Sequence, residues 1–303
     1  MKILVSGSSG LVGAALTETL RRDGHDVARL VRPGAEMRAG DVRWDPVTGE
    51  LDLAAAEGAD AAVNLAGASI AGGRWNEGRK RVLRSSRIDA TRHLVATLAK
   101  LKRPPRTLVS ASAIGYYGNR GEEVLTEESA PGSDFLALLA RDWESEAMRA
   151  EQTQIRTVLL RFGVILAAHG GALKKMLTPF KLGVGGKIGT GQQWMSWLTL
   201  AEAVGLVRHA LETTGLRGAV NAVSPAPARN SEFTRALGQA VRRPAIFPMP
   251  AFAARLAFGE MADALLLSSQ RVVPRRLDSA GYRFLAPELT GALREVLAHI
   301  RIA

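Results

Sequence analysis

The sequence predicts an α/β fold in which a doubly wound parallel sheet is joined to a smaller helix-rich C-terminal subdomain. Short apolar strand patterns alternate with helical patterns as far as residue 166. Strands separated by helices of this length form right-handed βαβ crossovers, and such crossovers build a parallel sheet. The second observation is a glycine-spaced turn at 7–13, which lies between the first strand and the first helix.

The first half of the chain supplies most of the expected sheet. Strands are expected at 2–7, 26–32, 41–45, 60–67, 106–112 and 155–166. Helices are expected at 10–22, 76–101 and 135–151. The segment RPGAEMRAG at 32–40 is expected to form a loop, because its proline and glycines interrupt both periodicities.

The pattern changes after residue 166. A helical piece and a glycine-rich loop come first, followed by an amphipathic helix at 198–212 and a strand at 218–223. The remainder is helix-rich and contains several prolines. We therefore predict a nucleotide-binding sheet domain over 1–223, with an excursion near 167–196, and a small C-terminal domain over 224–303.

Composition excludes several classes of protein. The chain has no cysteine, and its five histidines are scattered without an H-x-x-x-H pair. Disulfides and thiolate metal sites are therefore excluded, and we expect no metal centre. No apolar run reaches the roughly 18–20 residues that span a bilayer, and MKILVSG begins a strand without the charged start of a signal peptide. We expect a cytoplasmic protein with no membrane segment.

The formal net charge of +11 is the one unusual bulk property. Between Arg74 and Arg106, eleven lysines and arginines stand against only Glu77 and Asp89. Such a run can form an anion site or a nucleic-acid surface. No aromatic residues alternate with the charges as stacking platforms. We therefore interpret most of the run as a solvated helix face and do not expect nucleic-acid binding.

The turn VSGSSGLVG has the chemistry of a dinucleotide site. Gly7 permits the tight turn, Gly10 lets the backbone approach a pyrophosphate, and Gly13 lets the helix close on the strand. The helix N-terminus contributes the positive end of its dipole. Because the motif follows a strand and precedes a helix, it predicts a Rossmann-type domain.

The end of the second strand indicates which dinucleotide is bound. NAD enzymes usually place an acidic residue there to bind the ribose hydroxyls, but this chain has Arg32. An arginine can pair with a 2′-phosphate, so we expect NADP rather than NAD. The alternative is a surface arginine at the exit of a strand.

Several stretches together resemble the YfcH-like proteins, which are atypical extended short-chain dehydrogenases/reductases often labelled sugar-nucleotide-epimerase-like. The stretches are GSSGLVG (7–13), NLAGASI (64–70), SRIDATR (86–92), LLRFGVIL (159–166) and the long glycine-rich block at 170–197. The tail from NAVSPAPARNSEF (221–233) resembles their C-terminal domain of unknown function. The resemblance covers essentially the whole chain.

This resemblance implies a Rossmann domain that binds NADP, and a substrate that is unknown for most of the family. Arg87 would be an anion contact, and Ile165 would border the nicotinamide side. The implied cofactor contacts are Gly7, Ser8, Ser9, Gly10, Leu11, Val12, Arg32, Leu65, Ala66, Arg87 and Ile165.

Extended reductases use a serine or threonine together with a tyrosine and a lysine spaced four apart on one helix. On the helix at 135–151, the corresponding positions are Leu136 and Ala140, or Phe135 and Leu139 in the neighbouring frame. The Tyr–Lys pair is therefore absent. Ser112 stands where the family places its catalytic serine, and hydrogen bonding within the turn is the equal alternative.

Tyr116 and Tyr117 are the remaining candidates for a proton donor. Tyr117 precedes Gly118 and matches the V-Y-G tyrosine of extended reductases, which lines the substrate pocket. We therefore expect the two tyrosines to line a pocket rather than to donate a proton, with donation as the alternative.

We expect an NADP-binding oxidoreductase or epimerase of the atypical extended short-chain class. The absent Tyr–Lys pair keeps open a second hypothesis, a non-catalytic NADP-binding regulator or redox sensor. The expected partner is a small-molecule substrate, with phosphorylated and nucleotide-linked compounds included, and the chain is expected to be a monomer or a homodimer.

Overall fold

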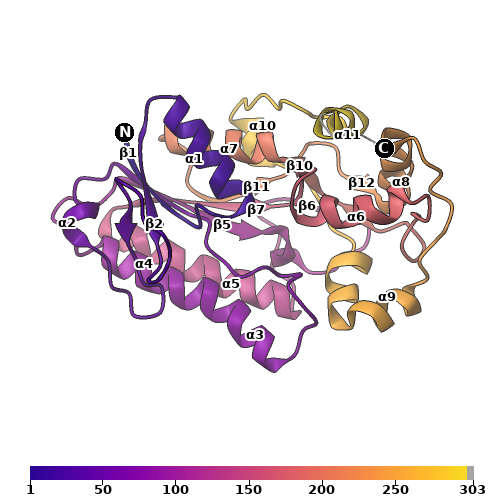
Figure 1. Ribbon diagram of the computed structural model, residues 1–303, viewed down its shortest axis with the longest axis horizontal. Coiled ribbons are helices and arrows are strands. Elements are labelled where there is room, and N and C mark those ends of the chain that lie inside the picture. Colours follow the sequence, from indigo (N-terminus) through magenta and orange to yellow (C-terminus); the bar gives the residue numbers. More distant parts are fainter. Residues whose placement is uncertain (299–303) are drawn as a thin grey trace. The chain divides into compact units, whose positions relative to one another are not determined.

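The computed structural model describes residues 1–298, which divide into two compact units (Figure 1). Unit 1 consists of Met1–Ser112, Leu139–Leu160 and Val204–Val220. Unit 2 consists of Ala113–Leu138, Arg161–Ala203 and the segment from Asn221 onward. The units interleave along the chain, so neither is one continuous stretch. The domain boundary expected at residue 223 stays a prediction.

A seven-stranded sheet has the order β11-β7-β5-β4-β1-β2-β3. Its neighbouring pairs β1–β2, β1–β4, β2–β3 and β4–β5 are parallel, which confirms the doubly wound α/β fold. The order reverses between β1 and β4, and ligands of such sheets bind beyond the strand ends at that reversal. The strands are β1 (Lys2–Ser6), β2 (Asp26–Val31), β3 (Val42–Arg43), β4 (Ala61–Asn64), β5 (Thr107–Ala113), β7 (Arg156–Phe162) and β11 (Gly218–Ala222).

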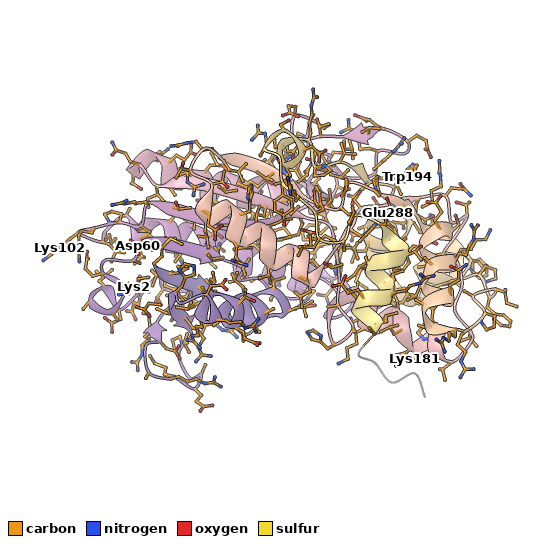
Figure 2. All side chains as sticks on the ribbon, turned by 90° about the horizontal axis from the view of Figure 1, so that it is seen from above. Lys2, Asp60, Lys102, Lys181, Trp194 and Glu288 are labelled. Carbon is orange, nitrogen blue, oxygen red and sulfur yellow. The ribbon has the colours of Figure 1, made fainter. Side chains whose placement is uncertain are left out.

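Two hydrogen bonds, one to a side chain and one to the backbone, join the chain where β1 and β4 begin. The N–H of Lys2 donates to Oδ2 of Asp60 at 2.8 Å, and the N–H of Asp60 donates to the carbonyl of Lys2 at 2.8 Å (Figure 2). The two strands then run in parallel until Ser6 faces Asn64. Both strands therefore end at the same level.

Helices cover both faces of the sheet in unit 1, with α1 and α7 on one face and α4 and α5 on the other (Figure 1). Leu94 and Leu98 of α4 pack into a buried cluster with Leu4, Leu30 and Leu108 of the strands. The long helix expected at 76–101 is interrupted by a π-helical turn, η1. The helices are α1 (Leu11–Arg22), α2 (Leu53–Ala56), α3 (Glu77–Arg84), η1 (Ser85–Asp89), α4 (Ala90–Leu98), α5 (Phe135–Met148), η3 (Arg149–Thr153) and α7 (Leu200–Glu212).

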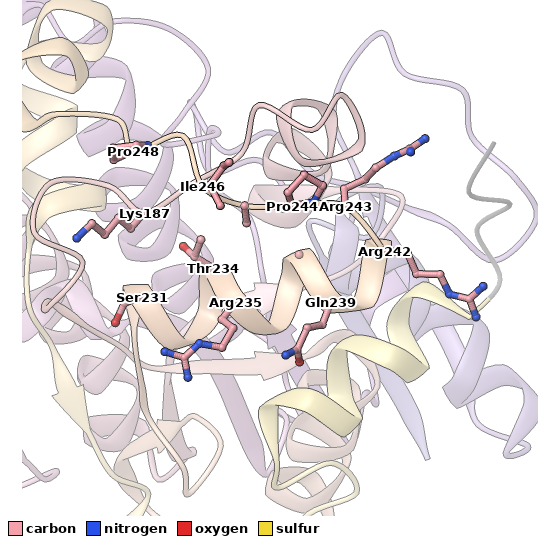
Figure 3. Close-up of a pocket in the computed structure, with 12 residues that line it drawn as sticks. Lys187, Ser231, Thr234, Arg235, Gln239, Arg242, Arg243, Pro244, Ile246 and Pro248 are labelled. Carbon is pink, nitrogen blue, oxygen red and sulfur yellow. The ribbon is translucent and has the colours of Figure 1, made fainter.

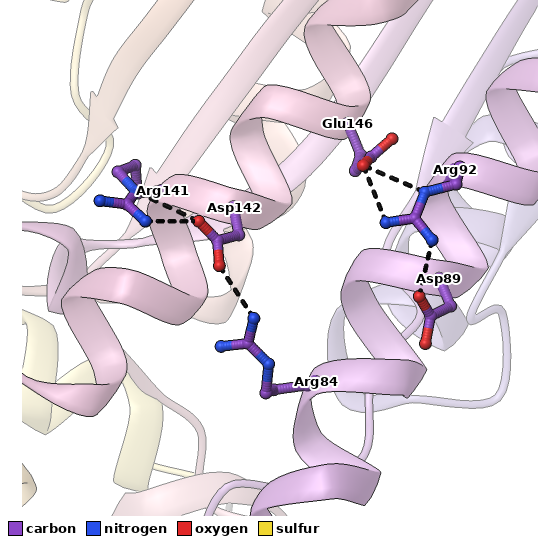
Figure 4. A network of polar contacts seen from close by, with 6 residues as sticks. All are labelled: Arg84, Asp89, Arg92, Arg141, Asp142 and Glu146. Carbon is purple, nitrogen blue, oxygen red and sulfur yellow. Dashed lines mark hydrogen bonds and ion pairs between the residues drawn. The ribbon is translucent and has the colours of Figure 1, made fainter.

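Acidic side chains of α5 pair with arginines from the basic run (Figure 4). Arg84 Nη2 lies 3.0 Å from Asp142, and Arg92 Nη2 lies 2.9 Å from Glu146. Such partly exposed pairs contribute only about 0–1 kcal/mol each. Their main consequence is electrostatic, since part of the positive charge of this run is neutralised within unit 1.

The strand expected at 155–166 is two strands, and Gly163 separates them. Its N–H donates to the carbonyl of Ala222, while the next residue, Val164, bonds to Ser196 instead. A Cβ at Gly163 would lie 2.6 Å from the carbonyl oxygen of Ser196. The chain can therefore leave the large sheet here only at a glycine. It continues as β8 (Val164–Leu166), which pairs with β10 (Trp197–Thr199).

Unit 2 has its own apolar core, in which α6, α8 and α11 meet. Leu173 and Phe180 of α6 pack in one buried cluster with Phe233 and Leu237 of α8 and Leu293 of α11. The further elements are η2 (Ile114–Tyr117), β6 (Val124–Leu125), α6 (Gly171–Lys181), β9 (Trp194–Met195), β12 (Ala228–Arg229), α8 (Asn230–Val241), α9 (Ala251–Phe258), η4 (Ala262–Leu267), β13 (Arg271–Val272), α10 (Arg275–Ser279) and α11 (Leu289–Leu297).

Within residues 1–298, no helix has both the length and the apolar character needed to cross a bilayer. The cytoplasmic location stays a prediction.

The close packing at Gly163 predicts that Gly163→Ala destabilises the fold by about 1–3 kcal/mol, the usual cost of overpacking. Gly215→Ala is the matched control, because nothing lies within 4 Å of a Cβ at that position. It should change the free energy of unfolding by less than about 1 kcal/mol. Urea denaturation followed by circular dichroism measures both, and equal midpoints for the two variants would contradict the steric argument.

Candidate functional site

Close packing requires glycine in the turn after β1. Gly7 has a φ of +75°, and a Cβ on it would lie 2.6 Å from the carbonyl carbon of Leu65 and 2.7 Å from the nitrogen of Ala66. A Cβ on Gly13 would lie 2.2 Å from the carbonyl oxygen of Gly7. Only glycines allow β1, α1 and the end of β4 to converge in this way. The predicted roles of Gly7 and Gly13 as packing glycines therefore have a direct structural basis.

The first turn of α1 is open to an anion. Its N-cap is Gly10, which offers no side-chain cap, and Ser9 and Gly10 are exposed while Leu11 and Val12 are half-buried. The first N–H groups of a helix have no partner inside the helix, and they carry the positive end of the dipole. The segment Gly7–Val12, with half-buried Ser8, therefore has the form of a phosphate-binding turn.

Arg87 lies next to this turn through the segment that follows β4. Its Nη2 donates to the carbonyl of Ala68 at 3.0 Å, and its guanidinium lies 3.0 Å from where a Cβ of Gly67 would be. The guanidinium also stacks 5.3 Å above the ring of Trp143. Burial, with the nearby charge of Arg79, lowers the pKa of Arg87 to about 10, so it stays charged at neutral pH.

No carboxylate in residues 1–298 forms an ion pair with Arg87, although burial makes an unpaired cation costly. The position on the π-helical turn η1 is also unusual, since such turns occur often at functional sites. Leu65 and Ala66 contact the Gly7 turn, and Arg87 contacts the next two residues, Gly67 and Ala68. This part of unit 1 can therefore accept a polyanion.

Arg32 follows β2 and lines a hollow at the same end of the sheet. The hollow has a volume of about 490 Å³ and includes Pro33, Gly34, Asp45, Pro46 and Val47. Leu30 of β2 faces Ser6 of β1 in the register, so Arg32 lies just beyond the level of the Gly7 turn. Its guanidinium forms no ion pair or hydrogen bond in the part of the chain that the structure describes, which leaves it available to a phosphate.

Ser112 lies at the end of β5, but its hydroxyl has a partner. It donates to Oε1 of Glu144 on α5 at 2.6 Å, and the two residues are 3% and 7% exposed. A second buried network joins Asn64, Ser110, Thr91 and Trp143 across β4, β5, α4 and α5. Ser112 therefore has a structural bond in unit 1, and its catalytic role stays a prediction.

Unit 2 contains the two tyrosines, on the short 3₁₀ turn η2. Tyr117 is fully buried, donates to Oδ1 of Asn221 at 2.6 Å and accepts from Nη1 of Arg161 at 2.9 Å. Burial raises the pKa of the Tyr117 hydroxyl to about 12, although Arg161 and Asn221 oppose that shift. A phenol so bonded and so weakly acidic is poorly suited to proton donation.

Tyr116 differs from its neighbour in exposure and in partners. It is half-buried, and its hydroxyl forms no hydrogen bond within residues 1–298. Its ring meets that of Tyr117 edge-on at 5.3 Å, and the guanidinium of Arg161 lies 3.6 Å from its centroid. Arg161 thus holds both tyrosines, one through the hydroxyl and one through the ring face.

Other predicted contacts are less informative. Ile165 is a half-buried residue of β8 that pairs with Leu198 in unit 2. Trp194, a further aromatic residue of unit 2 labelled in Figure 2, has the guanidinium groups of Arg229 and Arg271 at 4.5 and 4.6 Å from its ring centroid. Residues 1–298 hold no cluster of three metal-binding side chains.

Sequence reasoning missed Glu144, Arg161 and Asn221 as partners of the predicted residues. One signal was present for Arg161, because a charged residue interrupts the apolar run TVLLRFGVIL. Glu144 and Asn221 had no such signal, since their contacts join segments that lie 32 and 104 residues apart.

Comparisons with known proteins agree with this geometry. The model of the NAD dependent epimerase/dehydratase family matches residues 3–222, and that of a domain of unknown function, DUF1731, matches residues 249–296. The epimerase family protein Mb2239 of Mycobacterium bovis is 44% identical over 93% of each chain.

Two solved structures are also similar. That of the human epimerase family protein SDR39U1 with NADPH has a TM-score of 0.91 and 35% identity, and covers 99% of this chain and 100% of that one. A nucleoside-diphosphate sugar epimerase from Corynebacterium glutamicum has a TM-score of 0.81 and 33% identity, with all of this chain matching 59% of the longer one. These findings confirm the resemblance inferred from the sequence.

The buried tyrosine predicts a specific pH dependence. The Tyr117 pKa of about 12 in the folded protein exceeds the unfolded value of about 10. The stability linked to this group is therefore fully present below pH 10 and is lost as the pH rises toward 12. The loss should amount to about 2–3 kcal/mol.

Urea denaturation of the wild type and of Tyr117→Phe at pH 9 to 12 isolates this effect. The difference in unfolding free energy between them should shrink as the pH rises, because only the wild type loses the contribution. A constant difference across that range would show that Tyr117 is not held neutral by the fold.

Proposed function

The chain belongs to the NAD dependent epimerase/dehydratase family, and we propose that it is an NADPH-binding oxidoreductase or epimerase of the atypical extended short-chain class. The observation that carries the proposal is the Gly7–Val12 turn with Arg87 beside it. The turn offers uncapped helix amides, and Arg87 offers a buried cation without a carboxylate. The similar human protein was crystallised with NADPH.

Most chemical groups of NADPH have a proposed contact in unit 1. The Gly7–Val12 amides would hold the pyrophosphate. Leu65 and Ala66 would lie under it, where a Cβ on Gly7 would be only 2.6 Å from Leu65, so that no side chain fits between them. Arg32, in its hollow of about 490 Å³, would hold the 2′-phosphate. Arg87 would contact a further anionic or ribose group. In unit 2, Ile165 is the proposed apolar contact for the nicotinamide.

When bound, NADPH supplies a hydride. The chain must then supply a proton to the reduced substrate oxygen, and Tyr116 is the best candidate among the proposed catalytic residues. Its hydroxyl forms no hydrogen bond within residues 1–298, whereas those of Ser112 and Tyr117 donate to Glu144 and Asn221. Tyr116 follows Ser112 by four positions in the sequence. Arg161 would orient the Tyr116 ring.

A second candidate function is a non-catalytic NADPH-binding regulator or redox sensor. The observation that favours it is α5, which carries neither a tyrosine nor a lysine. The two proposals agree on the cofactor and differ in turnover.

The finer points of the proposal concern substrate and location. A phosphorylated or nucleotide-linked small molecule is supported by the similar nucleoside-diphosphate sugar epimerase, and by the surplus of cations over carboxylates in the chain. A cytoplasmic site of action would give the protein access to NADPH and to such substrates.

The cofactor assignment predicts tighter binding of NADPH than of NADH. Arg32→Ala should weaken NADPH binding ten- to a hundredfold, because it removes a charge-assisted phosphate bond of about 1.5–3 kcal/mol. NADH affinity should not change. Fluorescence titration of both nucleotides measures this, with Arg22→Ala as a control that removes an exposed arginine paired with Glu18 on α1. Equal wild-type affinities for NADPH and NADH would refute the assignment.

The proton-donor assignment predicts a difference between the two tyrosines. Tyr116→Phe should lower NADPH-dependent turnover by about 10²–10⁴-fold while NADPH affinity is kept. Tyr117→Phe and Ser112→Ala should retain turnover in proportion to their folded fraction. A panel of carbonyl, enone and nucleotide-sugar compounds would be followed through the loss of reduced-nicotinamide absorbance. Wild-type turnover in Tyr116→Phe would rule out this donor, and tight NADPH binding without turnover on any compound would favour the regulator.

A further inference from the structure

A second concave surface runs along one side of α8 in unit 2 (Figure 3). It has a volume of about 660 Å³, which is within the usual range for small-molecule sites. Four basic residues line it, with Lys187 and Arg235 toward one end and Arg242 and Arg243 toward the other. Arg235 lies on α8, and Arg242 is the residue that ends this helix. They are seven positions apart, which at the helical rise separates their backbones by about 10 Å.

These cations differ from the arginines shown in Figure 4, which have acidic partners. No carboxylate lines the α8 groove, and none of its four basic side chains forms an ion pair within residues 1–298. The nearest acid on α8, Glu232, is engaged by the backbone N–H of Arg229 at 2.7 Å. A concave group of unpaired cations concentrates positive potential, which attracts an anion.

The backbone at Arg242 is a second, independent observation. Arg242 has a φ of +55°, in the left-handed region that ends α8. Glycine or asparagine is the usual residue there, because a larger side chain costs free energy in this conformation. Strain of this kind is often kept where a side chain serves a function.

The floor and wall of the groove add polar and apolar contacts. Thr234 is 5% exposed, and its hydroxyl has no hydrogen-bond partner within residues 1–298 although it lines the groove. Figure 3 shows it projecting from α8 toward Ile246. Gly238 lets the chain at Ala245 approach closely, since a Cβ at Gly238 would lie 2.9 Å from that of Ala245.

We propose that this groove binds a small ligand with two or more linked phosphate groups, at a site separate from the Gly7 turn. The two pairs of cations would each hold part of the polyphosphate, and Thr234 would donate a hydrogen bond. The inference does not rest on NADPH binding, because every residue that carries it lies in unit 2.

Isothermal titration of the full chain with inorganic tripolyphosphate, at fixed ionic strength, tests the proposal. Arg235→Gln and Arg242→Gly should each weaken binding about tenfold, the effect of one charge-assisted bond. Arg294→Gln on α11, which removes an exposed charge outside the groove, should have no effect. Orthophosphate should bind at least tenfold more weakly than tripolyphosphate, because it reaches fewer of the cations.

Two further variants separate this site from the alternatives. Arg87→Gln removes the cation proposed for the cofactor site, so tripolyphosphate bound at the Gly7 turn weakens in this variant, whereas the binding that Arg235→Gln weakens should remain. Loss of all tripolyphosphate binding in Arg87→Gln, with full binding in the groove variants, would overturn the proposal in favour of the Gly7 turn. Arg242→Gly should not lower the thermal midpoint, because glycine accepts the positive φ. A lower midpoint with full affinity would mean that Arg242 serves the fold. Absence of tripolyphosphate binding, or binding only of a single-stranded RNA, would also overturn the proposal.

Discussion

The close contact between the Gly7 turn and the end of β4 is the constraint on which the rest of unit 1 depends. The backbones approach so nearly that a Cβ at Gly7 would lie 2.6 Å from Leu65. Gly13 meets the same turn even more closely, so β1, α1 and β4 converge at one point. This convergence occurs where the strand order reverses, and it leaves the first amides of α1 uncapped. The same glycines therefore provide the steric fit and the uncapped amides on which the proposed cofactor site depends.

The distribution of charge separates structural arginines from those available to ligands. Arg84 and Arg92 pair with acids of α5, and their positive charge is largely neutralised within the unit. Arg32 and Arg87 form no ion pair with a carboxylate within residues 1–298, and both are proposed contacts of the cofactor. The α8 groove of unit 2 likewise has basic side chains that form no ion pair within residues 1–298. The net charge of +11 thus says less about anion binding than does the set of cations that have no carboxylate partner within residues 1–298.

Arg161 contacts both Tyr116 and Tyr117 but does so differently, so the two phenols have different chemical properties. Arg161 donates to the hydroxyl of Tyr117 and stacks on the ring of Tyr116. The first contact belongs to a buried network that includes Asn221, and burial raises the pKa of Tyr117 to about 12. The second contact leaves the hydroxyl of Tyr116 free. The family's usual lysine is absent from α5, and the cation that contacts the candidate donor is an arginine from a strand, Arg161.

The sequence by itself determined the fold class, the family and the position of the glycine turn after β1, because these depend on local patterns. Each short stretch of sequence carries its own strand or helix periodicity, and the three glycines lie at fixed spacing within seven residues. It also indicated that the Tyr–Lys pair is missing. The sequence did not predict that the strand at 155–166 breaks at Gly163, because the cause is contact with Ser196 and Ala222, which lie far away in the chain. The sequence likewise did not indicate the bond between Ser112 and Glu144, the hydrogen bonds of Tyr117 with Asn221 and Arg161, or the α8 groove. In each case burial and partners come from segments far apart in the chain, and those two quantities decide whether a hydroxyl or a cation is free to act.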